Sequence, residues 1–298
     1  MRVLTRFLVV VGIAGTGLAV GLGLLAPEVK GFFTAAEAGK PNDVVKLGEL
    51  AQNSFVYARD GSLLAVLHAE ENRQPVELEQ VPKHVVDAIL DVEDDGFWNH
   101  RGVNLRSSVR ALVTNVSAGE VVQGGSTITQ QLVKNALLTP EKSLERKVRE
   151  AVLAVRLEDR LSKPEILKRY LNTVYFGNGA YGVQAAAQTY FNTDVDKLDV
   201  AQAAVLAGII RNPLGYDPLR QPVQARNRRN FALDRMVSNG HLSAAEATRL
   251  RDQPLPSQLT APEPPQDYFV EEVKQALLVD PRLGETPGER YNALFKGG

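Results

Sequence analysis

The chain contains no cysteine, and only four of its 298 residues are histidine. The absence of cysteine excludes disulfide bridges, thiolate metal sites and a cysteine nucleophile. Four histidines disfavour a multi-histidine metal centre. The chain also lacks an excess of charge of either sign, since 34 basic and 35 acidic side chains leave a formal net charge of −1. A bulk nucleic-acid binder would be basic and an acidic disordered chain strongly negative, so the composition indicates a globular protein of one or two domains.

The longest uncharged run covers residues 7–26. Twenty residues is about the length of one membrane-spanning helix. Arg2 and Arg6 precede the run and Glu28 follows it, a pattern that places the amino terminus in the cytoplasm and the rest of the chain outside. A cleaved signal peptide is the alternative, and Ala36–Ala38 offers a cleavage site, but the apolar part of a signal peptide is usually about 7–15 residues long. We therefore predict an uncleaved anchor, and leave cleavage open.

Two β-prone runs, residues 54–57 and 63–67, flank Asp60 and Gly61. Apolar runs on either side of an Asp-Gly pair predict a β-hairpin. From residue 82 to about residue 251 the hydrophobic pattern is mainly helical. This part of the chain is therefore expected to form a helical domain.

Several helix limits can be placed from the sequence. Ser162 is followed by Pro164 and Glu165, which predicts a helix capped by Ser162. Residues 254–265 hold five prolines and predict an extended linker. The other periodic segments predict helices over residues 142–161, 199–210, 224–239 and 268–278.

An acidic cluster is the first candidate for chemistry. Glu93, Asp94 and Asp95 lie beside Phe97 and Trp98. Neighbouring carboxylates repel each other and aromatic rings exclude water, and both effects raise a carboxyl pKa. A raised pKa suits a general acid or base. The alternative is an ordinary solvated turn or helix end.

A glycine pair at residues 124–125 precedes the second candidate. Thr127 and Gln130 have the spacing of a capping box that opens a helix. Gln130 or Gln131 then shares a helix face with Lys134. A helix start with a lysine about one turn inside can hold an anionic group such as a phosphate. The alternative is a plain helix cap, and the segment has no Walker spacing.

Two further segments have ordinary explanations when taken alone. Arg146 and Glu150 are four residues apart, which is the spacing of a surface ion pair on a helix. The aromatic residues of segment 170–183 would by default pack in a core. Its glycines imply bends or close backbone approach.

In their order and spacing these segments together resemble glycosyltransferase family 51. That family is the peptidoglycan polymerase domain of class A penicillin-binding proteins and of monofunctional transglycosylases. Asp217 departs from the asparagine usual in the family, and the resemblance covers roughly residues 50–250 together with the anchor. The matching motifs are Glu93, Asp94, Phe97, His100 and Gly102; residues 124–135; Arg146, Lys147 and Glu150; residues 170–182; and Leu206, Ala207, Gly208, Pro213 and residues 216–218.

The resemblance implies a mainly α fold, with a lysozyme-like helical catalytic domain, a small β-hairpin element and one N-terminal transmembrane helix. The chain holds no Ser-x-x-Lys and no Lys-Thr-Gly signature, so no transpeptidase activity is expected from these residues. Whether the chain is a fragment of a bifunctional protein or a natural monofunctional enzyme stays open. The expected segments are a cytoplasmic tail at 1–6, the anchor at 7–26, a juxtamembrane linker at 27–50, the glycosyltransferase domain at 51–253, and a Pro-rich linker with the start of a transpeptidase-domain connection at 254–298.

The resemblance also implies the reaction. Lipid II is polymerised into β-1,4 glycan strands with inversion, and undecaprenyl diphosphate is released at the bacterial cell membrane. The implied partners are lipid II, the undecaprenyl-linked glycan, the membrane and proteins of a cell-wall synthesis complex. No cofactor is required and no metal ligand is assigned, but stimulation by Mg²⁺ or Mn²⁺ stays open. The implied catalytic residues are Glu93 as general base and Glu150 in a supporting role, and the implied substrate-binding residues are Asp94, Phe97, His100, Thr127, Gln131, Lys134, Asn135 and Arg146.

Two other functions would share some of these features. A lysozyme-like hydrolase or lytic transglycosylase would share a helical fold and a catalytic glutamate, but not Lys134 and Arg146 as diphosphate ligands. A non-catalytic lipid II-binding scaffold would be signalled by loss of Glu93 or Glu150, and both are present.

Overall fold

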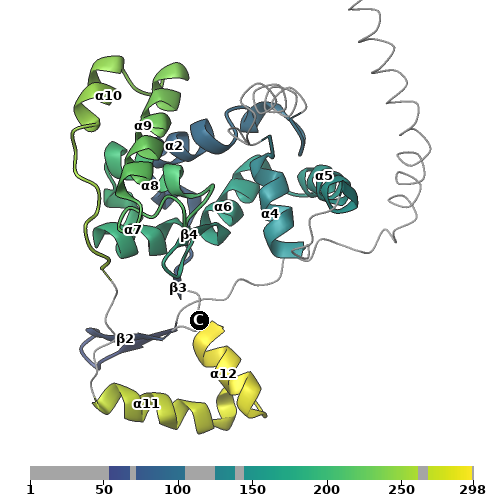
Figure 1. Ribbon diagram of the computed structural model, residues 1–298. Coiled ribbons are helices and arrows are strands. Elements are labelled where there is room, and N and C mark those ends of the chain that lie inside the picture. Colours follow the sequence, from purple (N-terminus) through teal and green to yellow (C-terminus); the bar gives the residue numbers. More distant parts are fainter. Residues whose placement is uncertain (1–53, 68–71, 105–124, 138–143, 261–267, 297–298) are drawn as a thin grey trace, which may run out of the picture. The chain divides into compact units, whose positions relative to one another are not determined.

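The computed structural model describes residues 54–67, 72–104, 125–137, 144–260 and 268–296. Within these ranges the chain is mainly helical with small sheets, as predicted (Figure 1). In chain order the elements are β1 (Ser54–Tyr57), β2 (Leu63–Leu67), β3 (Asn72–Arg73), η1 (Leu78–Gln80), α2 (Lys83–Glu93), η2 (Phe97–Asn99), α4 (Ile128–Leu137), α5 (Leu144–Glu158), α6 (Lys163–Thr173), β4 (Tyr175–Gly177), β5 (Ala180–Tyr181), α7 (Val183–Phe191), η3 (Val195–Lys197), α8 (Val200–Ile209), α9 (Pro222–Ser238), α10 (Ala244–Leu250), α11 (Tyr268–Val279), η4 (Pro281–Leu283) and α12 (Pro287–Lys296).

The predicted anchor at residues 7–26 lies outside the described residues. Among the residues that are described, no helix is both long and apolar enough to cross a membrane.

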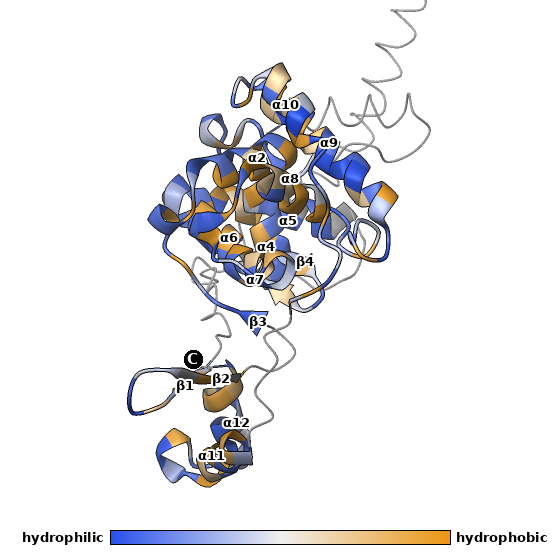
Figure 2. Cartoon of the chain, turned by 90° about the vertical axis from the view of Figure 1, so that its left-hand side faces the viewer, coloured by the Kyte–Doolittle hydropathy of each residue, from blue (hydrophilic) through white to orange (hydrophobic). Residues whose placement is uncertain are grey.

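Helix α8 forms the centre of the helical core. Eight of its ten residues are buried, and Figure 2 colours most of the helix as hydrophobic. It packs against α2 and α9. Gly208 allows the close approach of α9, because a Cβ atom at this position would lie 3.0 Å from the backbone carbonyl carbon of Arg228. This approach places α9 beside the end of α2.

Helix α4 packs against α5 and α6. The predicted capping box at its start is confirmed: the Gln130 amide donates to the Thr127 hydroxyl oxygen at 3.1 Å, and the Thr127 amide donates to Gln130 Oε1 at 2.9 Å. The Thr127 hydroxyl also donates to the carbonyl oxygen of Gly102 at 2.6 Å. Gly102 has a φ of +75°, and a Cβ atom there would lie 2.6 Å from the backbone of Ala154 in α5. Only glycine fits this position, so the chain before α4 is held tightly against α5.

Other local predictions are also confirmed. Ser162 caps α6, accepting from the Glu165 amide at 3.4 Å, and Pro164 lies in the first turn. The four helices predicted from hydrophobic periodicity correspond to α5, α8, α9 and α11, with ends shifted by up to three residues. Their existence was therefore encoded in short-range sequence patterns.

The predicted hairpin is formed by β1 and β2, which pair antiparallel with Ser54 opposite Leu67. In the turn, the Ser62 amide donates to Asp60 Oδ1 at 3.0 Å, and Gly61 takes a φ of +84°. A second sheet has the order β3–β5–β4, with β3 parallel and β4 antiparallel to β5.

The hairpin packs against the C-terminal helices α11 and α12. Ala65 and Leu67 of β2 form a hydrophobic cluster with Val270 of α11 and Leu294 of α12. The sequence analysis assigned the hairpin to the expected domain at 51–253 and the residues of α11 to the segment after it. The structure shows that these two distant parts of the chain share one small core.

Candidate active site

A polar pocket of about 230 Å³ lies where α2, α4, α8 and α9 approach one another. Its lining combines the acidic end of α2, the start of α4, the residues after α8 and one face of α9. The lining residues of the described part are Asp91, Val92, Glu93, Asp94, Asp95, Asn104, Gly125, Ser126, Thr127, Gln131, Lys134, Ile210, Arg211, Arg228, Phe231 and Arg235.

Glu93 is the last residue of α2 and lines this pocket. Its carboxylate oxygen Oε2 accepts a hydrogen bond of 2.8 Å from the side-chain amide of Gln131 in α4. The hydroxyl of Tyr170 in α6 donates to Oε1 of Gln131 at 3.3 Å. Three helices thus fix the position of one carboxylate.

Burial raises the pKa of Glu93 above its ordinary value. The hydrogen bond from Gln131 and the charges of Arg228 and Arg211 act in the opposite direction, and the charge of Asp94 adds to the increase. The expected direction is therefore confirmed, and of the two expected causes desolvation is the larger. Burial also raises the pKa of Tyr170 well above its usual value, so its hydroxyl stays protonated and donates.

The pocket lining also includes four cationic side chains. These are Lys134, Arg211, Arg228 and Arg235. The Arg228 guanidinium lies 5.1 Å from the ring centre of Tyr216 and 4.5 Å from that of Phe231, which holds the charge by cation–π contacts. Cations that line a pocket can stabilise an anionic group bound there.

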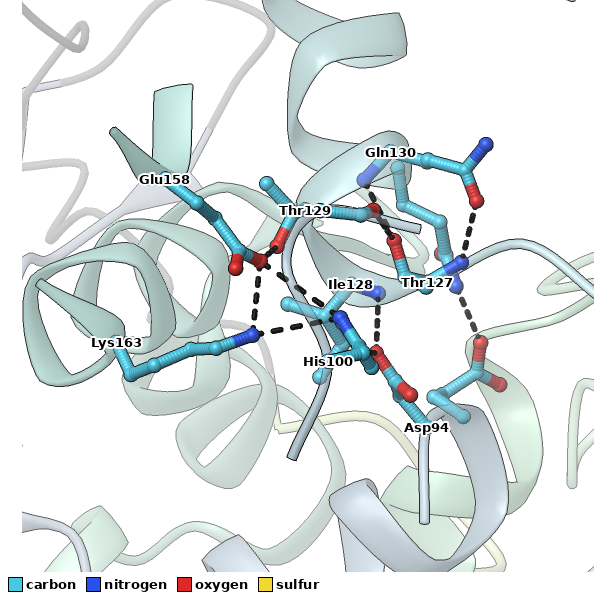
Figure 3. Close-up of polar contacts among 11 residues, drawn as sticks. Asp94, His100, Thr127, Ile128, Thr129, Gln130, Glu158 and Lys163 are labelled. Carbon is cyan, nitrogen blue, oxygen red and sulfur yellow. Dashed lines mark hydrogen bonds and ion pairs between the residues drawn. The ribbon is translucent and has the colours of Figure 1, made fainter. Parts of the chain in front are cut away.

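The structure brings five predicted site residues together in this pocket: Glu93, Asp94, Thr127, Gln131 and Lys134. Phe97 and His100 lie behind it. Asp94 Oδ2 accepts from the backbone amide of Ile128 at 3.0 Å and pairs with His100 Nε2 at 2.9 Å (Figure 3).

The other predicted residues, Asn135, Arg146 and Glu150, are not among the described residues that line the pocket. Glu150 is buried, with Arg146 Nη1 at 3.5 Å and the Lys147 ammonium in direct contact. Lys147 also donates to the hydroxyl of Ser126 in the pocket wall at 2.7 Å. Glu150 is thereby connected to the pocket through Lys147.

Sequence reasoning missed the arginines of the pocket lining, Arg211, Arg228 and Arg235. The four arginines of segment 224–239 were a signal for two of them. The glycine of the Leu206–Gly208 motif was another, because Gly208 lies directly against Arg228.

The amino-acid sequence of this chain is similar to those of known proteins. The family model described as Transglycosylase matches residues 60–237. The chain belongs to the transglycosylase family. Membership identifies these residues as a peptidoglycan glycosyltransferase domain, and the resemblance drawn from the motifs is confirmed.

Among relatives of this transglycosylase chain, Penicillin-binding protein 1A of Aquifex aeolicus is 38% identical over 266 residues, 89% of this chain and 36% of the relative. Penicillin-binding protein 1F of Bacillus subtilis is 42% identical over 206 residues, 69% of this chain and 29% of the relative. A crystal structure of Penicillin-binding protein 1A from Haemophilus influenzae aligns with a TM-score of 0.42 and 25% identity, over 78% of this chain and 25% of that one. The chain spans about a third of the length of these relatives.

The transglycosylase pocket contains several carboxylates, which are potential metal ligands. No group of three or more His, Cys, Asp or Glu residues that could hold a metal ion occurs in the described part of the chain. Independence from a cofactor stays a prediction.

Proposed function

We propose that this chain polymerises lipid II into β-1,4 glycan strands, with Glu93 as the general base. The observation that carries the proposal is the position of Glu93, a carboxylate with a raised pKa in a polar pocket that Lys134, Arg211 and Arg228 also line. A general base is most effective when its pKa lies near the working pH.

In the proposed step, the 4-hydroxyl of an incoming lipid II attacks the anomeric carbon of the growing glycan. Glu93 accepts the hydroxyl proton as the new C–O bond forms, and the bond to the diphosphate breaks with inversion. Negative charge then develops on the departing undecaprenyl diphosphate. Lys134, Arg211 and Arg228 line the pocket and supply cations that stabilise this charge. Because the leaving group is already activated, no separate general acid is needed.

The remaining predicted residues take supporting roles in this proposal. Thr127 and Gln131 contact the donor, and Gln131 also orients Glu93. Glu150 orients Arg146 and Lys147, and through Lys147 it fixes the pocket wall at Ser126. Asn135 and Arg146 contact the substrate outside the described pocket lining.

Residues 7–26 are proposed to be a single-pass anchor in the bacterial cell membrane. Lipid II and the growing glycan are both held in the membrane by their polyprenyl chains. Tethering the domain to the same surface raises its effective concentration toward both substrates. Proteins of a cell-wall synthesis complex are the proposed partners.

The function is tested by incubating labelled lipid II with the purified 298-residue chain in detergent. We expect long glycan strands that lysozyme digests, and we expect them also in EDTA, because side-chain cations rather than a resident metal supply the positive charge. Added Mg²⁺ or Mn²⁺ can then be tested for stimulation. Release of reducing ends or anhydro sugars from finished sacculi would instead identify a lytic enzyme. Binding of lipid II without product would identify a scaffold.

The raised pKa of Glu93 predicts where the rate falls on the acidic side of the pH–rate profile. Glu93 must be deprotonated to act as a base, so kcat/KM should fall as the pH drops through a pKa above the ordinary glutamate value. Gln131→Leu removes a hydrogen bond that favours the charged carboxylate, and should move this limb to higher pH. An acidic limb that does not move in Gln131→Leu would contradict the assignment of the limb to Glu93.

A further inference from the structure

A buried network of charged side chains lies behind the pocket and does not line it. Lys163 Nζ lies 2.8 Å from Glu158 Oε1, and the hydroxyl of Thr129 donates to the same oxygen at 2.5 Å. Lys163 Nζ also lies 3.4 Å from His100 Nδ1 (Figure 3). The side chains of Glu158, His100 and Lys163 are 5%, 8% and 19% exposed, so water screens these contacts only weakly.

Lys163 determines which nitrogen of His100 carries a proton. An ammonium group has donors and no acceptor, so the Nδ1 atom that faces it must accept. The proton of a neutral imidazole then lies on Nε2, where it is donated to Asp94 Oδ2 at 2.9 Å. Lys163 thus favours the ring form in which Nδ1 accepts and the proton lies on Nε2.

Glu158 favours a proton on Nδ1 of His100, which is the opposite of the effect of Lys163. It also holds Lys163 in place through their ion pair. Its Oε1 atom lies 3.9 Å from His100 Nδ1, where a carboxylate favours an N–H group. The ammonium at 3.4 Å is closer, and it is held over the Phe97 ring, 4.4 Å from its centre. The groups that face His100 are therefore Asp94, Glu158 and Lys163, with Lys163 deciding the tautomer.

The tautomer of His100 affects the position of Glu93, and Asp94 connects the two residues. The same oxygen of Asp94 accepts from His100 and from the backbone amide of Ile128, the first residue of α4. Asp94 follows Glu93 directly, and α4 carries Gln131, which hydrogen-bonds Glu93. The contact of Asp94 with Ile128 therefore sets the end of α2 against the start of α4.

We propose that Lys163 and Glu158 are positioning residues for glycan polymerisation. They keep His100 as an Nε2–H donor to Asp94 and so fix the geometry between Glu93 and Gln131. The inference rests on the proposed role of Glu93 as base. A buried ion pair with a purely structural role would contribute to stability but would not select a histidine tautomer.

The test measures the tautomer and the rate separately, using the full chain in detergent. The chain has four histidines, so ¹⁵N-histidine labelling gives a tractable NMR spectrum of the ring nitrogens. In the wild type, one ring is expected to carry its proton on Nε2 and none on Nδ1. In Lys163→Met, Nδ1 of that ring should gain a proton, because Glu158 is then the group that faces this nitrogen. We expect kcat for lipid II to fall roughly tenfold or more, with KM changed by less than about threefold, because misplacement of a reacting group costs rate.

Three further variants complete the test. Glu158→Gln in the Lys163→Met background removes the carboxylate and offers an amide donor to Nδ1, so it should restore the Nε2–H form and part of kcat. Lys163→Arg keeps a donor and should keep the tautomer even if Lys163→Met folds poorly. Lys168→Met, on the same helix but paired with Glu77 and Glu165, is the matched control and should change neither measurement.

Three results would overturn the proposal: an Nδ1 that stays unprotonated in Lys163→Met, an Nδ1 that gains a proton in Lys163→Arg, or a gain of that proton in Lys163→Met that leaves kcat at the wild-type value. The NMR measurement needs no turnover. A wild type with the expected tautomer but no polymerisation would therefore refute the proposed function and not the network.

Discussion

Glu93→Gln is expected to reduce the rate of lipid II polymerisation by roughly 10²–10⁴-fold, the usual contribution of a general base. Glutamine keeps the size of the side chain and an oxygen that accepts from Gln131, but it cannot take the hydroxyl proton. The measurement is the initial rate of glycan formation from labelled lipid II. Glu79→Gln, an exposed glutamate of η1, is the matched control and should leave the rate unchanged.

The same variant should not lose stability, and this separates a catalytic role from a structural one. Burial raises the pKa of Glu93 in the folded chain, so the stability that its protonated form contributes is lost as the pH rises through that pKa. At neutral pH the charged carboxylate therefore costs stability, and neutral glutamine removes this cost. We expect a melting temperature equal to or above that of the wild type. A clearly lower melting temperature together with lost activity would indicate that Glu93 supports the fold.

Lys134→Met is expected to reduce the rate by roughly 10²–10³-fold, the range found when a group that stabilises developing charge is removed. Lys134 is exposed and lines the pocket, so its loss should leave the fold intact. Lys134→Arg keeps the charge and should retain most of the rate. Release of undecaprenyl diphosphate in a single turnover is the appropriate measurement, because it follows the step in which the negative charge develops.

The control for Lys134 is Lys83→Met. The Lys83 side chain is 80% exposed at the start of α2 and pairs with Asp87 one turn along the same helix. Its replacement should change the single-turnover rate by less than about twofold, since exposed pairs of this kind contribute little. Equal losses in both lysine variants would show that net charge, rather than the position of Lys134, controls the rate.

Local features of this fold could be predicted because short-range rules decide them. Ser162 caps α6, and Thr127 and Gln130 form the capping box of α4, as their spacing indicated. The turn at Asp60 and Gly61 joins the predicted strands. In each case the residues that decide the structure lie within a few positions of one another, so no tertiary information was needed.

Features that depend on tertiary packing could not be predicted in the same way. Arg146 and Glu150 have the spacing of a surface ion pair, but Glu150 is 1% exposed and its close partner is Lys147. Arg211 and Arg228 reach the pocket only because α8 and α9 pack against α2. Nothing in their local sequence gives the distance to Glu93, which lies more than a hundred positions earlier.

The shared core of the hairpin and the C-terminal helices has a consequence for the order of folding. Leu67 leaves the ribosome early, but its partner Val270 follows about 200 residues later. Bacterial ribosomes add roughly 5–20 residues per second. The apolar side of the hairpin therefore stays exposed for on the order of 10–40 seconds before α11 has been synthesised. The contact also closes a very long loop and so is entropically costly to form early. We therefore expect this small core to assemble last during biosynthesis.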